Sequence, residues 1–248
     1  MKRFFFTAFC GIFSVSLFAF SPPIAAAKIN GKISLAPAFL EKHEAVHNEA
    51  DKAFRGYWND PNAIQPIAPL SLALHSDFGV VLFRDGAPEP KPDPIRTVQV
   101  FAGALEQNVI VIRPQSRIKF HSVDPLDHDL YASDKHDFKP QQMAQNSVRP
   151  VDFYSAGLFE VRCTLMPHFS AWIVVEPATY VAELKRDGAF QIDAAEPGEY
   201  TLKVFFRGQW IHERKFTIRD EKEVQVTIQL ESPTASAAKP AKDEPKEK

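Results

Sequence analysis

The sequence predicts an all-β protein with one short helix near its N-terminus. Twenty prolines against ten glycines suit short strands with long connections better than a helix bundle. Many short segments also alternate apolar and polar residues at the period of two that is typical of strands. The chain has 248 residues and is 45% hydrophobic, which is enough for one or two domains with real cores. The strand pattern changes at Glu176, so we expect two modules.

The first module begins with a predicted strand over 28–37 and a predicted amphipathic helix over 38–58, where apolar residues recur at helical spacing. The proline-rich stretch 84–94 cannot form regular structure and predicts a loop. Further strands are predicted within 68–83 and at 97–101, 109–112, 117–120, 159–163 and 173–175.

The N-terminus has the pattern of a secretory signal peptide. Two basic residues precede the apolar run 4–20, and the alanines at 25–27 form a small-residue cleavage site. The alternative, an uncleaved membrane anchor, is disfavoured because the run is short and interrupted by polar residues. We therefore expect a signal peptide over 1–27, a periplasmic or secreted mature protein that starts at Lys28, and no stable membrane span after cleavage.

Export makes the cysteine content informative, because Cys10 leaves with the signal and only Cys163 remains. In an oxidising compartment a free thiol is expected to be buried, paired between chains or bound to metal. Cys163 ends one predicted strand, and Met166 and His168 follow in the loop before the next. All three side chains can hold a soft or borderline metal. The alternative is that Cys163 is a small buried apolar residue.

Two segments carry a resemblance to a known family. Residues 120–131 read Phe-His-Ser-Val-Asp-Pro-Leu-Asp-His-Asp-Leu-Tyr, and residues 156–163 read Ala-Gly-Leu-Phe-Glu-Val-Arg-Cys. They resemble the cupredoxins, the blue-copper proteins of the plastocyanin and azurin type, in the exported methylamine-utilisation-type branch. The resemblance implies a Greek-key β-sandwich with His128 and Cys163 as copper ligands. His121 competes with His128 but ranks second, because it lies within the end of a strand.

The ligand loop aligns with the family in two ways, and both remain open. Against azurin-like members, His168 is the second histidine ligand and Trp172 occupies the axial methionine position. Against members with a shorter loop, Met166 stands at the ligand histidine, His168 at a tryptophan and Phe169 at the axial methionine. A coordinating Met166 favours Cu(I), which prefers soft ligands.

The second module has predicted strands within 180–230. Its segments Asp-Gly-Ala-Phe-Gln-Ile (187–192) and Pro-Gly-Glu-Tyr-Thr-Leu-Lys-Val (197–204) resemble the carboxypeptidase regulatory-like, or transthyretin-like, β-sandwich. That resemblance implies a packing or docking surface rather than chemistry. The predicted division is therefore a signal peptide at 1–27, a cupredoxin-like domain at 28–175, a regulatory-like sandwich at 176–231, and a tail at 232–248 whose composition predicts disorder.

The leading functional hypothesis is copper binding with one-electron transfer. Neutral imidazoles of His128 and His168 and the thiolate of Cys163 are the expected ligands, Met166 is a further candidate, and a redox partner protein is a possible partner. The alternative is a copper-free structural or interaction module with a degenerate metal site. A net charge of −2 gives no reason to expect a nucleic-acid partner. We expect no enzyme, because the zinc-protease pattern at 43–47 (His-Glu-Ala-Val-His) lacks a third ligand.

Overall fold

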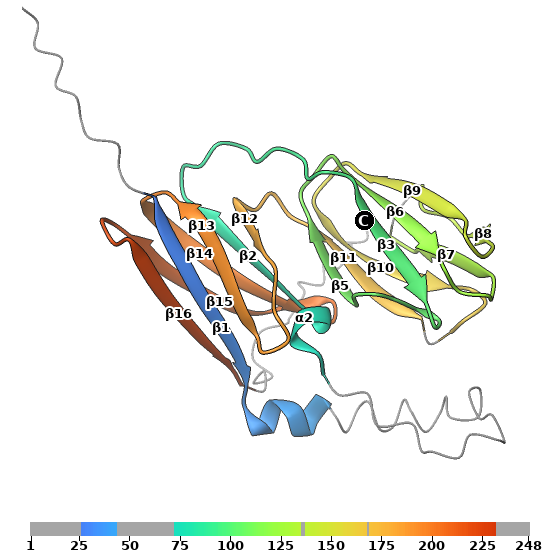
Figure 1. Cartoon of the computed structure of the whole chain (residues 1–248), viewed down its shortest axis with the longest axis horizontal. Helices are drawn as coiled ribbons and strands as arrows, with labels where there is room; N and C mark the ends of the chain where they lie inside the picture. Colours follow the sequence, from blue (N-terminus) through green and yellow to red (C-terminus); the bar gives the residue numbers. More distant parts are fainter. Residues whose placement is uncertain (1–25, 44–71, 135–136, 168, 232–248) are drawn as a thin grey trace, which may run out of the picture.

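The computed structural model describes residues 26–43, 72–134, 137–167 and 169–231. Its strands form four β-sheets, which pair into two sandwiches lying side by side (Figure 1). The predicted all-β class is therefore confirmed. Residues 37–43 are helical, and the rest of the predicted helix over 38–58 lies outside the described residues. A second short helix, α2 (Leu74–Asp77), occupies part of the stretch 68–83 where only strands were expected.

One sandwich comprises the strands between residues 96 and 175, and we call it the inserted sandwich. Its first sheet has the order β4 (Ala104–Leu105), β3 (Arg96–Phe101), β6 (Ser116–Ser122), β9 (Val148–Phe153). Its second has the order β5 (Val109–Ile112), β11 (Ser170–Val175), β10 (Gly157–Cys163), β7 (His128–Ala132), β8 (Gln141–Met143). Side chains from both sheets fill one core between them.

The other sandwich, which we call the host sandwich, combines strands from both ends of the chain. Its first sheet has the order β13 (Ala189–Ala195), β1 (Ala27–Leu35), β16 (Glu223–Leu230). Its second has the order β12 (Tyr180–Ala182), β2 (Phe78–Arg84), β14 (Gly198–Phe206), β15 (Gln209–Ile218). The strand β1 runs antiparallel to β13 and parallel to β16.

This pairing differs from the division predicted from the sequence. That division placed residues 28–175 in one domain, whereas β1 and β2 lie in the host sandwich with the strands of 176–231. The inserted sandwich sits between β2 and β12, which are antiparallel neighbours. The physical reason is that alternation identifies a strand and its apolar face, while the neighbour of that strand is chosen by long-range packing.

A third apolar cluster joins the two sandwiches. Alternate residues of β5 face opposite ways: Ile110 and Ile112 lie in the core of the inserted sandwich, and Val109 and Val111 lie against the host sandwich. The ring of Trp172 contacts Gly208 of the host sandwich, where a Cβ atom would come within 2.7 Å of the ring. The four sheets therefore form consecutive layers, and β5, most of β2 and the end of β11 are buried on both faces. This explains their continuous apolar runs.

Two connections link the sandwiches, and Arg113 holds both. Its guanidinium donates to the carbonyls of Ala178 and Thr179, at 2.9 and 2.8 Å, and pairs with Asp93 at 2.5 Å.

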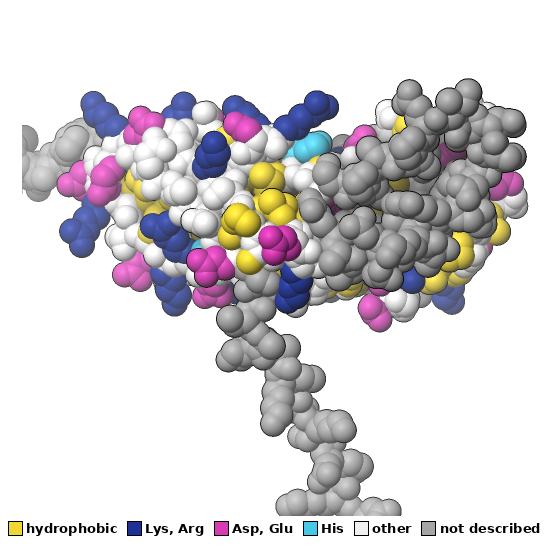
Figure 2. All heavy atoms as spheres, turned by 90° about the horizontal axis from the view of Figure 1, so that it is seen from below, with side chains coloured by type: hydrophobic (Ala, Val, Ile, Leu, Met, Phe, Trp, Pro, Cys, Tyr) yellow, Lys and Arg dark blue, Asp and Glu magenta, His cyan; other side chains and the backbone are white. Residues whose placement is uncertain are grey.

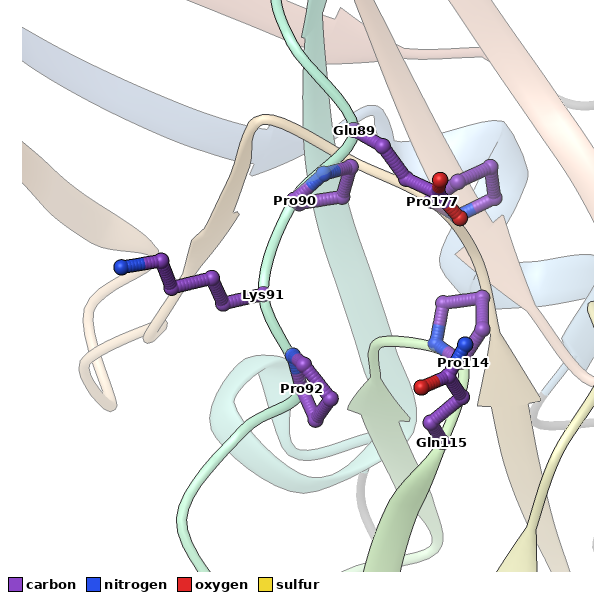
Figure 3. A pocket seen from close by; sticks show the side chains of 7 residues that line it. All are labelled: Glu89, Pro90, Lys91, Pro92, Pro114, Gln115 and Pro177. Atoms are coloured by element: carbon purple, nitrogen blue, oxygen red, sulfur yellow. The ribbon is translucent and has the colours of Figure 1, made fainter.

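A hollow of about 200 Å³ lies where the connections meet the turn before β6 (Figure 3). It is lined by Glu89, Pro90, Lys91, Pro92, Pro114, Gln115 and Pro177. The candidate ligand His128 follows the other end of β6, which lies about 20 Å from this turn at 3.3 Å per residue.

Candidate metal centre

The two ligand candidates with the strongest sequence support lie on neighbouring strands. His128 begins β7 and Cys163 ends β10, and these strands pair antiparallel with Cys163 opposite Leu130. Both side chains are on the inward face, with His128 0% and Cys163 4% exposed. Because each is set by a paired strand rather than by a free loop, their relative position is well determined.

The imidazole and the thiol face each other. His128 Nδ1 lies 4.0 Å from Cys163 Sγ, and Sγ accepts the backbone N–H of Asp129 at 3.3 Å. Metal–nitrogen and metal–sulfur bonds of about 2.0 and 2.3 Å together span slightly more than this gap. A single metal ion can therefore bridge the two atoms, and nitrogen with sulfur is the donor pair that copper and zinc accept. These two residues fit a metal.

The loop between β10 and β11 supplies further buried side chains. Met166 and Phe169 are both buried in the core that contains Cys163, and the Phe169 N–H donates to the Met166 carbonyl at 2.9 Å. The loop is tied to β7 because Thr164 Oγ1 donates to Asp129 Oδ2 at 2.7 Å. His168, the predicted second histidine ligand, lies outside the described residues. Across the described part of the chain, no three or more His, Cys, Asp or Glu side chains gather into a metal-holding group.

Trp172 does not face the candidate centre. In the azurin-like alignment it stands at the axial position, but its neighbours Ala171 and Ile173 point into the core, and Trp172 packs on the host sandwich against Phe205. The structure therefore assigns Trp172 to the contact between sandwiches. In the shorter-loop alignment the axial position falls on Phe169, which is buried with its ring centroid 6.1 Å from that of His128.

The other histidine candidates lie elsewhere. His121 alternates on β6 with the buried Phe120 and Ser122, so its side chain is on the opposite face from the core. The ring of His43 packs against Phe39 and Phe206, with centroid distances of 4.4 and 4.8 Å. The remaining residues of the zinc-protease pattern, 44–47, lie outside the described residues.

One residue beside the centre was not singled out from the sequence. Asp124 is 4% exposed, and its Oδ2 lies 3.2 Å from His128 Nε2 and accepts the Gly103 N–H at 2.7 Å. The available sequence signal was its position four residues before the candidate ligand His128. An aspartate in a loop is too common for that position alone to indicate a site. Only the fold shows that this carboxylate is buried against the imidazole.

The face of the molecule drawn in Figure 2 carries charges of both signs. Lys and Arg side chains are interspersed with Asp and Glu on the described part of the face seen from below (Figure 2). Such a mixture produces no large field of one sign over that area. Within the described residues, no helix is long and apolar enough to cross a membrane.

Comparison with known proteins gives matches among solved structures alone. No protein-family model and no curated protein matches the chain. A purple cupredoxin from Nitrosopumilus maritimus is 13% identical, with 33% of this chain and 99% of that chain covered, at a TM-score of 0.31. Amicyanin from Paracoccus versutus is 18% identical, with 38% and 97% covered, also at 0.31. A copper-containing nitrite reductase from Thermus scotoductus is 20% identical, with 37% and 24% covered, at 0.30. Part of this chain is thus similar to solved cupredoxins.

Proposed function

We propose that this chain is an exported, cupredoxin-like copper-binding protein that transfers one electron at a time. The observation that carries the proposal is the buried pair of His128 Nδ1 and Cys163 Sγ, 4.0 Å apart. A buried imidazole and a buried thiol that face each other form a donor pair for a soft or borderline metal. Export rests on the signal-like sequence before Lys28.

The chain's own residues support reversible electron transfer by holding the two candidate ligands in fixed positions. Both ligands are held by paired strands, and Asp129 ties the sulfur to β7 through its N–H. His128 and Cys163 would hold a copper ion that would supply the one-electron chemistry, and their rigid frame would limit rearrangement between the two oxidation states. His168 is the proposed third ligand and Met166 the proposed thioether. A redox partner protein completes the proposed activity.

The test is a Cu(II) titration of the purified mature protein followed by visible absorption. An intense thiolate-to-copper band is expected in the wild type and not in Cys163→Ala. Cu(I) binding is measured in parallel by competition with a chromogenic chelator. His168→Gln and Met166→Leu then identify the third ligand, because the variant that removes it changes the band or the Cu(I) affinity. A colourless wild type that also fails to retain Cu(I) would overturn the proposal.

A second candidate is a copper-free structural or interaction module. The observation that favours it is the burial of Met166 and Phe169, which the shorter-loop alignment places where the family has a ligand histidine and an axial methionine. In that case Cys163 is a packed apolar residue. The distinguishing result is a wild type without metal affinity, in which Cys163→Ala costs only the free energy of a small core cavity.

A further inference from the structure

We infer that Asp124 is a positioning residue that holds the proton of His128 on Nε2, so that the unprotonated Nδ1 faces Cys163. The role of this arrangement in metal binding rests on the proposed function. The arrangement itself belongs to the metal-free protein and can be measured there.

The contact between the carboxylate and the imidazole selects one tautomer. Asp124 Oδ2 lies 3.2 Å from His128 Nε2, and both residues are buried. An ionised carboxylate only accepts hydrogen bonds, and a neutral imidazole carries its proton on one nitrogen. With the proton on Nε2 the contact is a hydrogen bond. With the proton on Nδ1 it would set a lone pair against a buried carboxylate, which is costly away from water.

A hairpin from another part of the sheet holds Asp124 in place. The turn between β3 and β4 has Ala102 at φ 52° and Gly103 at φ 71°, the left-handed pair that a two-residue hairpin requires. It directs the Gly103 N–H to Asp124 Oδ2 at 2.7 Å. The register is set by the parallel pairing of β3 with β6, continued by the Val123 N–H, which donates to the Val100 carbonyl at 3.0 Å. The sheet therefore fixes the carboxylate before any metal arrives.

A proton held on Nε2 leaves Nδ1, on the other side of the imidazole ring, free to face Cys163. Cys163 Sγ already accepts the Asp129 N–H, so it has a donor without help from His128. With Nδ1 unprotonated, nitrogen and sulfur lone pairs converge across 4.0 Å, which suits a cation. With Nδ1 protonated, a proton would stand between them. Outer-shell partners of metal-binding histidines act in this way, and their removal typically lowers metal affinity by about 10–100-fold.

The test uses the ¹⁵N-labelled, metal-free full chain and a long-range ¹H–¹⁵N spectrum that distinguishes the two tautomers. The His128 signals are assigned by their loss in His128→Gln. Asp124→Leu removes the acceptor, and Asp124→Asn keeps an oxygen there. Asp127→Asn is the matched control, since Asp127 lies in the same loop but is exposed and bonded to Gln142. We expect Nε2–H in the wild type, Asp124→Asn and Asp127→Asn, and a mixed or Nδ1–H form in Asp124→Leu.

Cu(I) affinity, measured by competition, is expected to fall by about 10–100-fold in Asp124→Leu and by less in Asp124→Asn. An Nδ1–H tautomer in the wild type would overturn the inference even if Asp124→Leu does not fold. An unchanged tautomer in a folded Asp124→Leu would also overturn it. A wild type that holds Nε2–H and binds no copper would instead overturn the proposed function, and would support the role of Asp124 in fixing the tautomer.

Discussion

A fragment of residues 176–231 is expected not to fold, although it contains every strand of the second module predicted from the sequence. In the structure the host sandwich also needs β1 and β2, which supply fully buried side chains to its core. Burial of one such side chain contributes about 1.5–3 kcal/mol. The buried side chains that are lost with the two strands therefore contribute roughly 10 kcal/mol in total. This is similar to the whole free energy of unfolding of an ordinary domain. The lost side chains are Ile29, Ile33, Phe78, Val80 and Leu82.

The assay is thermal unfolding by circular dichroism, together with amide dispersion in a ¹H–¹⁵N spectrum. The control deletes residues 86–177 and joins β2 to β12 through a short turn, with Val81→Thr and Phe205→Thr to make the exposed face polar. It keeps the strands at both ends of the chain, and we expect a dispersed spectrum and cooperative unfolding. Cooperative unfolding of the fragment 176–231 alone would refute the reasoning.

The remaining predictions concern the contact between the sandwiches and His212, a half-buried histidine on β15. Gly208→Ala is expected to destabilise the protein by about 2–4 kcal/mol in urea unfolding, because its φ of 84° is unfavourable for alanine and its Cβ would meet Trp172. Gly86→Ala is the control, with a φ of 70° but open space around it, and should cost only about 1 kcal/mol; equal losses would show that the Trp172 contact is unimportant. Burial, reinforced by Arg214, lowers the pKa of His212, so the unfolded chain binds its proton more readily and wild-type stability falls as the pH drops through about 6.5. His212→Gln should lose less Tm between pH 7.5 and pH 5 than the wild type, and an identical pH dependence would contradict this.

The strands themselves were predictable because their side chains follow local rules. The alternation at β16 (Glu223–Leu230) and the β-branched run in β11 are written in consecutive residues. The β-branched run at 109–112 predicted a strand, and the structure shows that this strand, β5, is buried on both faces. The short helix α2 was missed because its four residues are too few to show helical periodicity.

The partners of those strands were not predictable in the same way. Any strand with one apolar face can pair with many others, so nothing in the stretch that forms β1 identifies β16 as its neighbour. That pairing closes a sandwich around a core shared by both ends of the chain, and it became visible only in the tertiary structure. The same holds for the four-layer stack, in which Trp172 packs on the host sandwich rather than facing the candidate centre.

The candidate centre was likewise predictable only in part from the sequence. The sequence by itself singled out His128 and Cys163 as ligand candidates, because their residue types and strand contexts carry chemical information. Only the fold could set Nδ1 and Sγ 4.0 Å apart, bury Met166 and Phe169 beside them, and bring Gly103 to Asp124. These relations depend on distances between segments remote in sequence, and such distances are decided by packing of the whole sheet rather than by local residue preferences.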